Sequence, residues 1–129
     1  AISKDVFDYV KFAGNCKQEF IANVLPHSFA ILSPHMGRGL TEAALSGVPI
    51  VGYDYDWQRE VIINNKTGYL IEHENWMAMS DAVEHLLSNK NIAEKLGKNA
   101  RDHIAKMMNP ENLNNHEKNC YSSIIESEL

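Results

Sequence analysis

Short apolar runs recur along the chain, separated by segments whose apolar residues have helical spacing. Residues 28–33 (Ser-Phe-Ala-Ile-Leu-Ser) and residues 48–53 (Val-Pro-Ile-Val-Gly-Tyr) are continuous runs without strict alternation. Such runs are typical of strands that are buried on both faces, as in a parallel sheet. Residues 9–13, closed by the turn-forming Gly14, and residues 69–71 complete a set of four predicted strands.

Apolar residues three or four positions apart predict helices between and after these strands. The predicted helices cover residues 16–25, 40–46 and 59–64, and three more begin at residues 75, 91 and 109. Asn91 and Glu94 have the spacing of a capping box, and Asn109, followed by Pro110 and Glu111, is typical of a helix start. The resulting order βαβαβαβααα predicts an α/β fold, a Rossmann-like open parallel sheet with helices on both faces.

Length and charge limit the possible functions. The chain has 129 residues, of which 44% are hydrophobic, so we expect one domain over residues 1–129. The 17 acidic residues outnumber the 12 basic ones, and neither kind is clustered. No basic stripe is present to neutralise a phosphate backbone, which argues against nucleic acid as a partner.

The sequence also gives an expectation for the cellular compartment of the protein. Its longest apolar stretch is too short to cross a bilayer, and its amino end does not have the order of a signal peptide. Cys16 and Cys120 have no CxxC or zinc-ligand spacing, and the histidines show no HExxH grouping, so we predict two free thiols and no metal site. We expect a cytoplasmic protein without a transmembrane segment. Because the chain starts at Ala1 without a methionine, we also expect residues upstream.

The turn after the second predicted strand is the best candidate binding site, because open α/β sheets bind ligands at the carboxyl ends of their strands. Gly37 and Gly39 let the backbone approach a ligand closely, and the following helix start favours an anion such as a diphosphate. Glu42 falls one turn inside that helix, where its carboxylate can accept hydrogen bonds from two hydroxyls, as on a ribose. From spacing alone, a glycine turn with a capping acid explains the same residues.

A longer segment around this turn resembles a known family. Residues 33–51 (Ser-Pro-His-Met-Gly-Arg-Gly-Leu-Thr-Glu-Ala-Ala-Leu-Ser-Gly-Val-Pro-Ile-Val) resemble the donor-site segment of retaining GT-B glycosyltransferases of the group 1 / family 4 type. Residues 60–62 with 67–71 resemble the next segment of that family, and residues 96–101 resemble its late helix. With residues 12–14 upstream, the resemblance extends over nearly the whole chain and implies the carboxyl-terminal, donor-binding half of a GT-B fold.

The resemblance implies that the domain binds a nucleotide diphosphate sugar as donor substrate, with no other cofactor, for transfer of the glycosyl group to an acceptor. Glu42 would hold the ribose hydroxyls, and the amides of residues 37–40 would face the diphosphate. The expected substrate-binding residues are His35, Met36, Gly37, Arg38, Gly39, Leu40 and Glu42. No catalytic residue is assigned, because the resemblance leads us to expect the acceptor domain and the cationic pair of the family before Ala1. The missing domain is the expected partner, and through it the enzyme could lie at the inner face of the membrane.

One departure from the family pattern lies in the turn itself, besides the absent cationic pair and acceptor domain. Pro34 stands where the family has its first glutamate, against the sugar ring, and Pro34 has no side-chain acceptor. His35 is the candidate substitute for that polar group. Arg38 is the only cation inside the turn, where it could contact a phosphate or be a solvated surface side chain.

Residues 56–60 are a secondary candidate, because this stretch lines the donor pocket in the family that the chain resembles. Asp54, Asp56 and Glu60 could form a carboxylate cluster, although acidic loops are usually solvated. Trp57 could cover a sugar or pack on the domain, and packing is the favoured interpretation.

Three alternative functions fit parts of the sequence. A sugar-nucleotide epimerase shares the GT-B architecture and a similar donor turn. A flavodoxin-like signalling or receiver module has a similar sheet, and Asp54 is its only plausible acceptor in this chain. A noncatalytic binding domain would explain Pro34 in place of the first glutamate.

Overall fold

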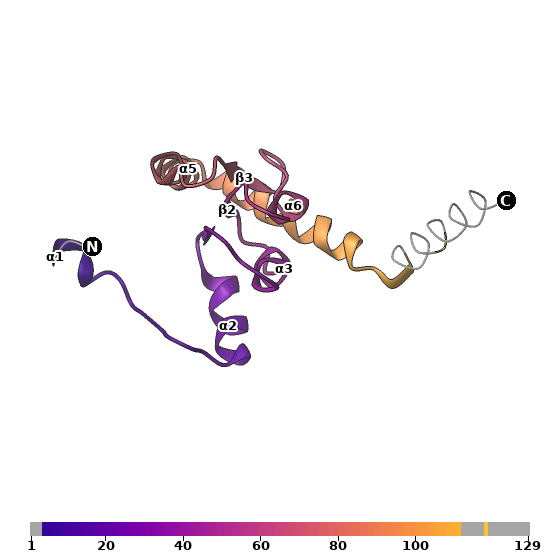
Figure 1. Cartoon of the computed structure of the whole chain (residues 1–129), viewed down its shortest axis with the longest axis horizontal. Coiled ribbons are helices and arrows are strands. Elements are labelled where there is room, and N and C mark those ends of the chain that lie inside the picture. The colour runs from indigo at the N-terminus through magenta and orange to yellow at the C-terminus, as the bar shows by residue number, and fades with distance from the viewer. Residues whose placement is uncertain (1–3, 112–117, 119–129) are drawn as a thin grey trace.

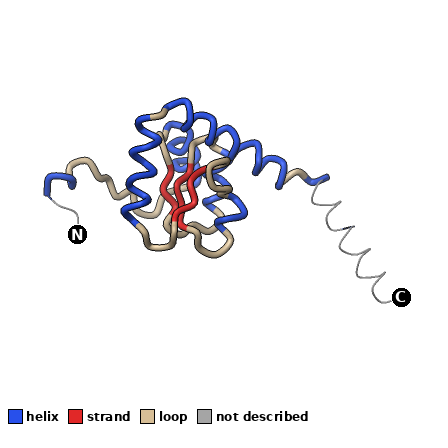
Figure 2. Tube along the Cα trace, turned by 90° about the horizontal axis from the view of Figure 1, so that it is seen from above, coloured by secondary structure: helices blue, strands red, loops and turns tan. Residues whose placement is uncertain are grey.

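A parallel sheet of three strands lies at the centre of the computed structural model, which describes residues 4–111 and residue 118. The strands are β1 (Ile31–Ser33), β2 (Ile50–Tyr53) and β3 (Gly68–Ile71), in the order β1-β2-β3. Ile31 pairs with Ile50, which pairs in turn with Gly68. Figure 2 shows the three strands side by side with helices around them. Because all three are parallel, their carboxyl ends meet at one edge of the sheet.

Helices connect the strands and cover both faces of the sheet. Their bounds are α1 (Lys4–Phe7), α2 (Gln18–Val24), the 3-10 turn η1 (Leu25–His27), α3 (Gly39–Leu45), α4 (Gln58–Val61), α5 (Trp76–Ser88) and α6 (Lys90–Met107). Figure 1 shows α5 on one side of the strands and α3 on the other. The predicted fold class, an open parallel sheet between helices, is therefore confirmed.

The central strand β2 separates the core into two layers. Ile50 packs with Leu40 and Ala44 of α3 in one layer. Its neighbour Val51 points to the opposite face and packs with Leu86 of α5 in the other layer. Successive side chains of a strand point to opposite faces, so one buried strand contributes to both layers. The continuous apolar run at residues 48–53 predicted this correctly.

β1 is shorter than predicted and is buried on one face only. Ile31 and Ser33 are buried, whereas Leu32 between them is 50% exposed. β1 lies at the edge of the three-stranded sheet, and a groove lined by Leu32, Trp76 and Val83 stays open between β1 and α5. The prediction of burial on both faces is therefore wrong for β1, because α5 packs mainly over β2 and β3.

Residues 9–13 do not form the predicted strand. They belong to an arm that extends away from the sheet, as Figures 1 and 2 show, and Tyr9 and Phe12 are 88% and 75% exposed. A strand needs a neighbour to accept and donate its backbone hydrogen bonds, and none of the described strands lies beside this segment. The turn at Gly14 is confirmed by a φ of 67°.

The predicted helices after β1 are confirmed to within a few residues, but the predicted cap of one of them is wrong. α6 begins at Lys90, and the predicted capping box of Asn91 and Glu94 does not form. Asn89 is the sole link between α5 and α6, and its side-chain amide donates to the carbonyl of His85 at 2.9 Å, so it closes α5. The helix predicted from residue 109 lies almost wholly outside the described residues.

Two smaller predictions concern the ends of the described region. Asn109 Oδ1 accepts a hydrogen bond from the amide of Glu111 at 2.9 Å, as a helix cap does. Cys16 is a free thiol, whereas Cys120 lies outside the described residues. Within the described ranges, no helix combines the length and the apolar character needed to cross a membrane.

α6 approaches the turn after α3 closely at one glycine. A Cβ atom at Gly97 would lie 2.1 Å from the carbonyl oxygen of Gly47 and 3.1 Å from the amide nitrogen of Pro49. Real Cβ atoms do not come this close to backbone, so any side chain at residue 97 would push α6 away from the core. The glycine within residues 96–101, the stretch that resembles the family's late helix, is thus required by the packing of α6.

We expect Gly97→Ala to lower the free energy of unfolding by about 1–3 kcal/mol, because overpacking against backbone cannot be relieved by a rotamer change. At an open helix position the same substitution would raise stability by about 1 kcal/mol, so the sign is informative. Denaturant unfolding measures it, with Lys98→Ala at the neighbouring exposed residue as control. A Gly97→Ala protein as stable as the parent chain would contradict this account of the packing.

Candidate functional site

The turn between β1 and α3 presents backbone amides at the carboxyl edge of the sheet. The Leu40 amide donates to the Gly37 carbonyl at 3.0 Å, and the Leu40 side chain is buried in the core, so Leu40 supports the turn from below. Among the described residues, the amides of Gly37, Arg38 and Gly39 have no hydrogen-bond acceptor. These three amides could therefore donate to a ligand, whereas the Leu40 amide is already bonded within the turn.

Met36 anchors the turn to the domain. Its backbone N–H donates to Oε1 of Gln58 at 3.3 Å, and its side chain packs against the core cluster of β1, α3 and α6. The amide of Met36 is therefore already used within the protein. Met36 holds the loop in place, while the three residues after it carry the amides without acceptors.

Glu42 faces an open cavity between α2 and α3. The cavity has a volume of about 280 Å³ and is lined by Gln18, Ala22, Leu25, Pro26, Glu42, Leu45 and Ser46. The Glu42 side chain is exposed, and its Oε1 accepts a hydrogen bond from Nε2 of Gln18 at 3.2 Å. A carboxylate with a single long hydrogen bond keeps capacity for further donors, such as two hydroxyls of one ligand.

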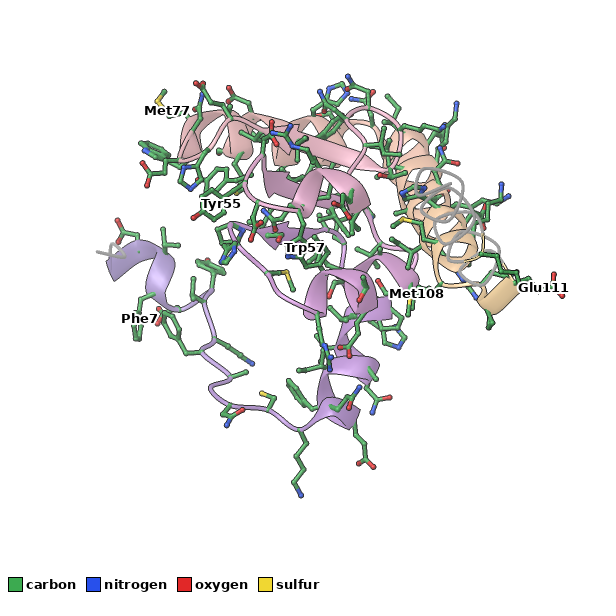
Figure 3. All side chains as sticks on the ribbon, turned by 45° about the vertical axis from the view of Figure 1, so that its right-hand side comes forward. Phe7, Tyr55, Trp57, Met77, Met108 and Glu111 are labelled. Atoms are coloured by element: carbon green, nitrogen blue, oxygen red, sulfur yellow. The ribbon has the colours of Figure 1, made fainter. Side chains whose placement is uncertain are left out.

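His35 lies in a group of aromatic rings at the carboxyl ends of the strands. Its ring meets Tyr55 edge-on at a centroid distance of 5.1 Å, and Tyr55 stacks on His73 at 4.5 Å. His35 Nε2 is 4.0 Å from Oδ2 of Asp56, and the His35 side chain is 59% exposed. In Figure 3, Tyr55 lies at the outer edge of this region, and Trp57 lies further inside. The rings form a wall beside the turn.

The acidic residues after β2 have separate partners. Asp54 Oδ1 binds Arg59 through Nη2 at 2.9 Å and Nε at 3.1 Å, whereas Asp56 approaches His35. No group of three histidine, cysteine or acidic side chains suited to a metal is found in the part of the chain that the structure describes. The favoured interpretation of Trp57 is confirmed, because it packs against the core.

A comparison with known protein families identifies the family of this chain. The family model described as glycosyl transferases group 1 matches residues 2–103 of the chain, which include every candidate site residue. The chain belongs to the glycosyl transferases group 1 family. This membership confirms the resemblance and removes the receiver-module interpretation, whose acceptor Asp54 is in any case paired with Arg59.

Two relatives of this group 1 glycosyltransferase domain come from bacteria. A poly(ribitol-phosphate) alpha-N-acetylglucosaminyltransferase from Staphylococcus aureus (strain COL) is 34% identical over 84 residues, 63% of this chain and 17% of the relative. An N-acetyl-alpha-D-glucosaminyl L-malate synthase from Bacillus anthracis is 28% identical over 122 residues, 92% of this chain and 32% of the relative. The chain thus spans about a third or less of the length of these relatives.

The fold of the group 1 glycosyltransferase domain matches a solved GT-B structure. Sucrose-phosphate synthase from Thermosynechococcus elongatus aligns with a TM-score of 0.78 at 22% identity, over 95% of this chain and 32% of that structure. At this identity the likeness concerns the fold alone. It supports the predicted Rossmann-like fold of the GT-B kind.

One residue of this group 1 domain has a structural role that its sequence context did not reveal. Gln58 fell inside the secondary candidate stretch 56–60, yet no function was assigned to it. The structure buries Gln58 completely, beneath the turn and between the ends of two strands. A buried glutamine carries no sequence signal that distinguishes it from a solvated one, and the residues that follow Gln58, Arg59 and Glu60, are exposed and charged.

We expect Glu42→Ala to change the free energy of unfolding by less than about 1 kcal/mol, because substitutions at exposed, weakly bonded side chains have small effects. Thermal unfolding of the variant and of the parent chain measures the difference. A larger destabilisation would mean that Glu42 holds the fold together, and would remove the reason to regard it as a ligand group.

Proposed function

We propose that this domain binds the nucleotide diphosphate sugar of a glycosyltransferase, with Glu42 holding the ribose and the turn at residues 37–39 holding the diphosphate. One observation carries the proposal: an exposed carboxylate that lines an open cavity lies one helical turn after three amides without acceptors. Membership of the glycosyl transferases group 1 family supports it, because the match covers this whole region.

In this proposal the cavity between α2 and α3 receives the nucleoside. The Glu42 carboxylate accepts hydrogen bonds from both ribose hydroxyls, replacing its single bond to Gln18. The apolar part of the wall, formed by Ala22, Leu25 and Leu45, offers a surface for the flat face of the base. The Gln18 amide, released from Glu42, is then available to a polar edge of the base.

The diphosphate would lie over the turn. The N–H groups of Gly37, Arg38 and Gly39 have no acceptor among the described residues, and amides held in place in this way stabilise anionic oxygen. Charge grows on the diphosphate as the bond to the sugar breaks, so donors held in place before the reaction lower its barrier. Arg38, whose side chain is exposed, supplies a positive charge beside them.

His35 would be the polar group nearest the sugar, in place of the glutamate that Pro34 replaces. Its exposed ring lies against Tyr55 and near Asp56, at the end of the turn that faces the strand ends. This position allows a hydrogen bond from the imidazole to a sugar hydroxyl. The acceptor would bind in parts of the enzyme beyond the matched segment, since the chain covers 17% and 32% of the two relatives.

We expect one of UDP, GDP or ADP to bind the protein in isothermal titration calorimetry. Glu42→Ala should weaken that binding at least about tenfold, because hydrogen bonds to a charged group contribute about 1.5–3 kcal/mol each. Glu19→Ala is the matched control, since Glu19 is an exposed acid on α2 that does not line the cavity.

Two results would contradict the proposed function. Absence of heat with all three nucleotides at millimolar protein concentration would mean that the domain does not hold the nucleotide. Equal affinity of Glu42→Ala and Glu19→Ala would mean that Glu42 is not the ribose-binding group.

A further inference from the structure

Gln58 is a polar side chain enclosed in the core directly beneath the candidate turn. It is the first residue of α4 and is 0% exposed. Its Oε1 accepts hydrogen bonds from the Met36 amide at 3.3 Å and from the Ser33 hydroxyl. Its Nε2 donates to the carbonyl oxygens of Tyr53 at 2.8 Å and of Ser33 at 3.4 Å.

These bonds use every donor and acceptor of the side-chain amide. A carboxamide has two N–H donors and an oxygen with two lone pairs, and each has a partner inside the protein. Burying a polar side chain costs free energy unless each of its polar atoms is hydrogen-bonded. A shift of any of these partners would leave one atom of the Gln58 amide without a bond. The partners lie at the end of β1, at the end of β2 and in the turn.

We propose that Gln58 is a positioning residue that fixes the turn at residues 34–39 in its ligand-binding shape. This inference rests on the proposed function of that turn. Gln58 itself is too deeply buried to touch a ligand, so it acts through the Met36 amide, which it holds inward. The amides of residues 37–39 are then oriented before a ligand arrives, which reduces the entropy lost on binding.

A purely structural role is the competing explanation, and Thr67 provides the comparison. Thr67 is also buried, and its hydroxyl accepts from the Ile63 amide at 2.7 Å and donates to the Val61 carbonyl at 2.9 Å. It precedes β3 and so lies at the amino edge of the sheet, opposite the turn. Loss of the Thr67 hydrogen bonds should lower the free energy of unfolding without changing the conformation of the turn at residues 34–39.

The test compares Gln58→Met with Thr67→Val in the full chain, since both replacements keep volume and remove hydrogen bonds. We expect Gln58→Met to accelerate hydrogen exchange of the Met36 amide, followed by NMR, at least tenfold. It should also weaken binding of whichever of UDP, GDP and ADP binds the parent chain at least tenfold. Thr67→Val should lower the unfolding midpoint while leaving both the exchange rate and the affinity within twofold.

Ser33→Ala covers the case in which Gln58→Met does not fold, because it removes one bond and leaves the Gln58 side chain in place. We expect it to weaken binding about fivefold, the equivalent of one net hydrogen bond. Unchanged Met36 exchange in Gln58→Met, or an affinity equal to that of Thr67→Val, would overturn the inference. If the parent chain binds none of the nucleotides, the proposed function fails, whereas faster Met36 exchange would still support the positioning of the turn by Gln58.

Discussion

The structure depends on the burial of β2 on both faces between two parallel neighbours. The strands approach so closely that a Cβ atom at Gly68 would lie 2.3 Å from the Ile50 carbonyl oxygen. A Cβ atom at Gly52 would likewise lie 2.5 Å from Ile62 of the following loop. This packing sets the carboxyl ends of β1 and β2 beside each other. Everything at the candidate site follows from that edge, because the turn, the ring wall and Gln58 all join it.

The sequence predicted those parts of the fold that follow from local pattern. The apolar run containing Ile50 and Val51 indicated a strand buried on both faces, and the structure has one. Residues 9–13 have the same β-rich composition, yet pairing depends on a neighbour that local sequence does not reveal. The spacing of Asn91 and Glu94 failed for a related reason, since the preceding Asn89 turned its side chain to the end of α5.

For the candidate site, sequence and structure contributed different information. Glu42 and the glycines were found from their place after the second predicted strand and from the family resemblance, and the structure adds that the carboxylate is exposed beside a cavity. Which amides are open to a ligand could not be read from the sequence. That depends on hydrogen bonds inside the turn and on Gln58, whose partners are 22 and 25 positions away in the chain. Long-range polar contacts of this kind leave no periodic trace.

The single-residue link between α5 and α6 has a consequence for cooperativity. α6 contributes Ala93 and Leu96 to the layer shared with α5, and Ala100 and Ile104 to the layer shared with α3. With only Asn89 between them, α5 cannot detach without pulling the start of α6, and thereby disturbing the opposite layer. We therefore expect the two layers of the core to unfold as one unit, so that loosening α5 on one face of the sheet would also weaken the packing of α3 on the other.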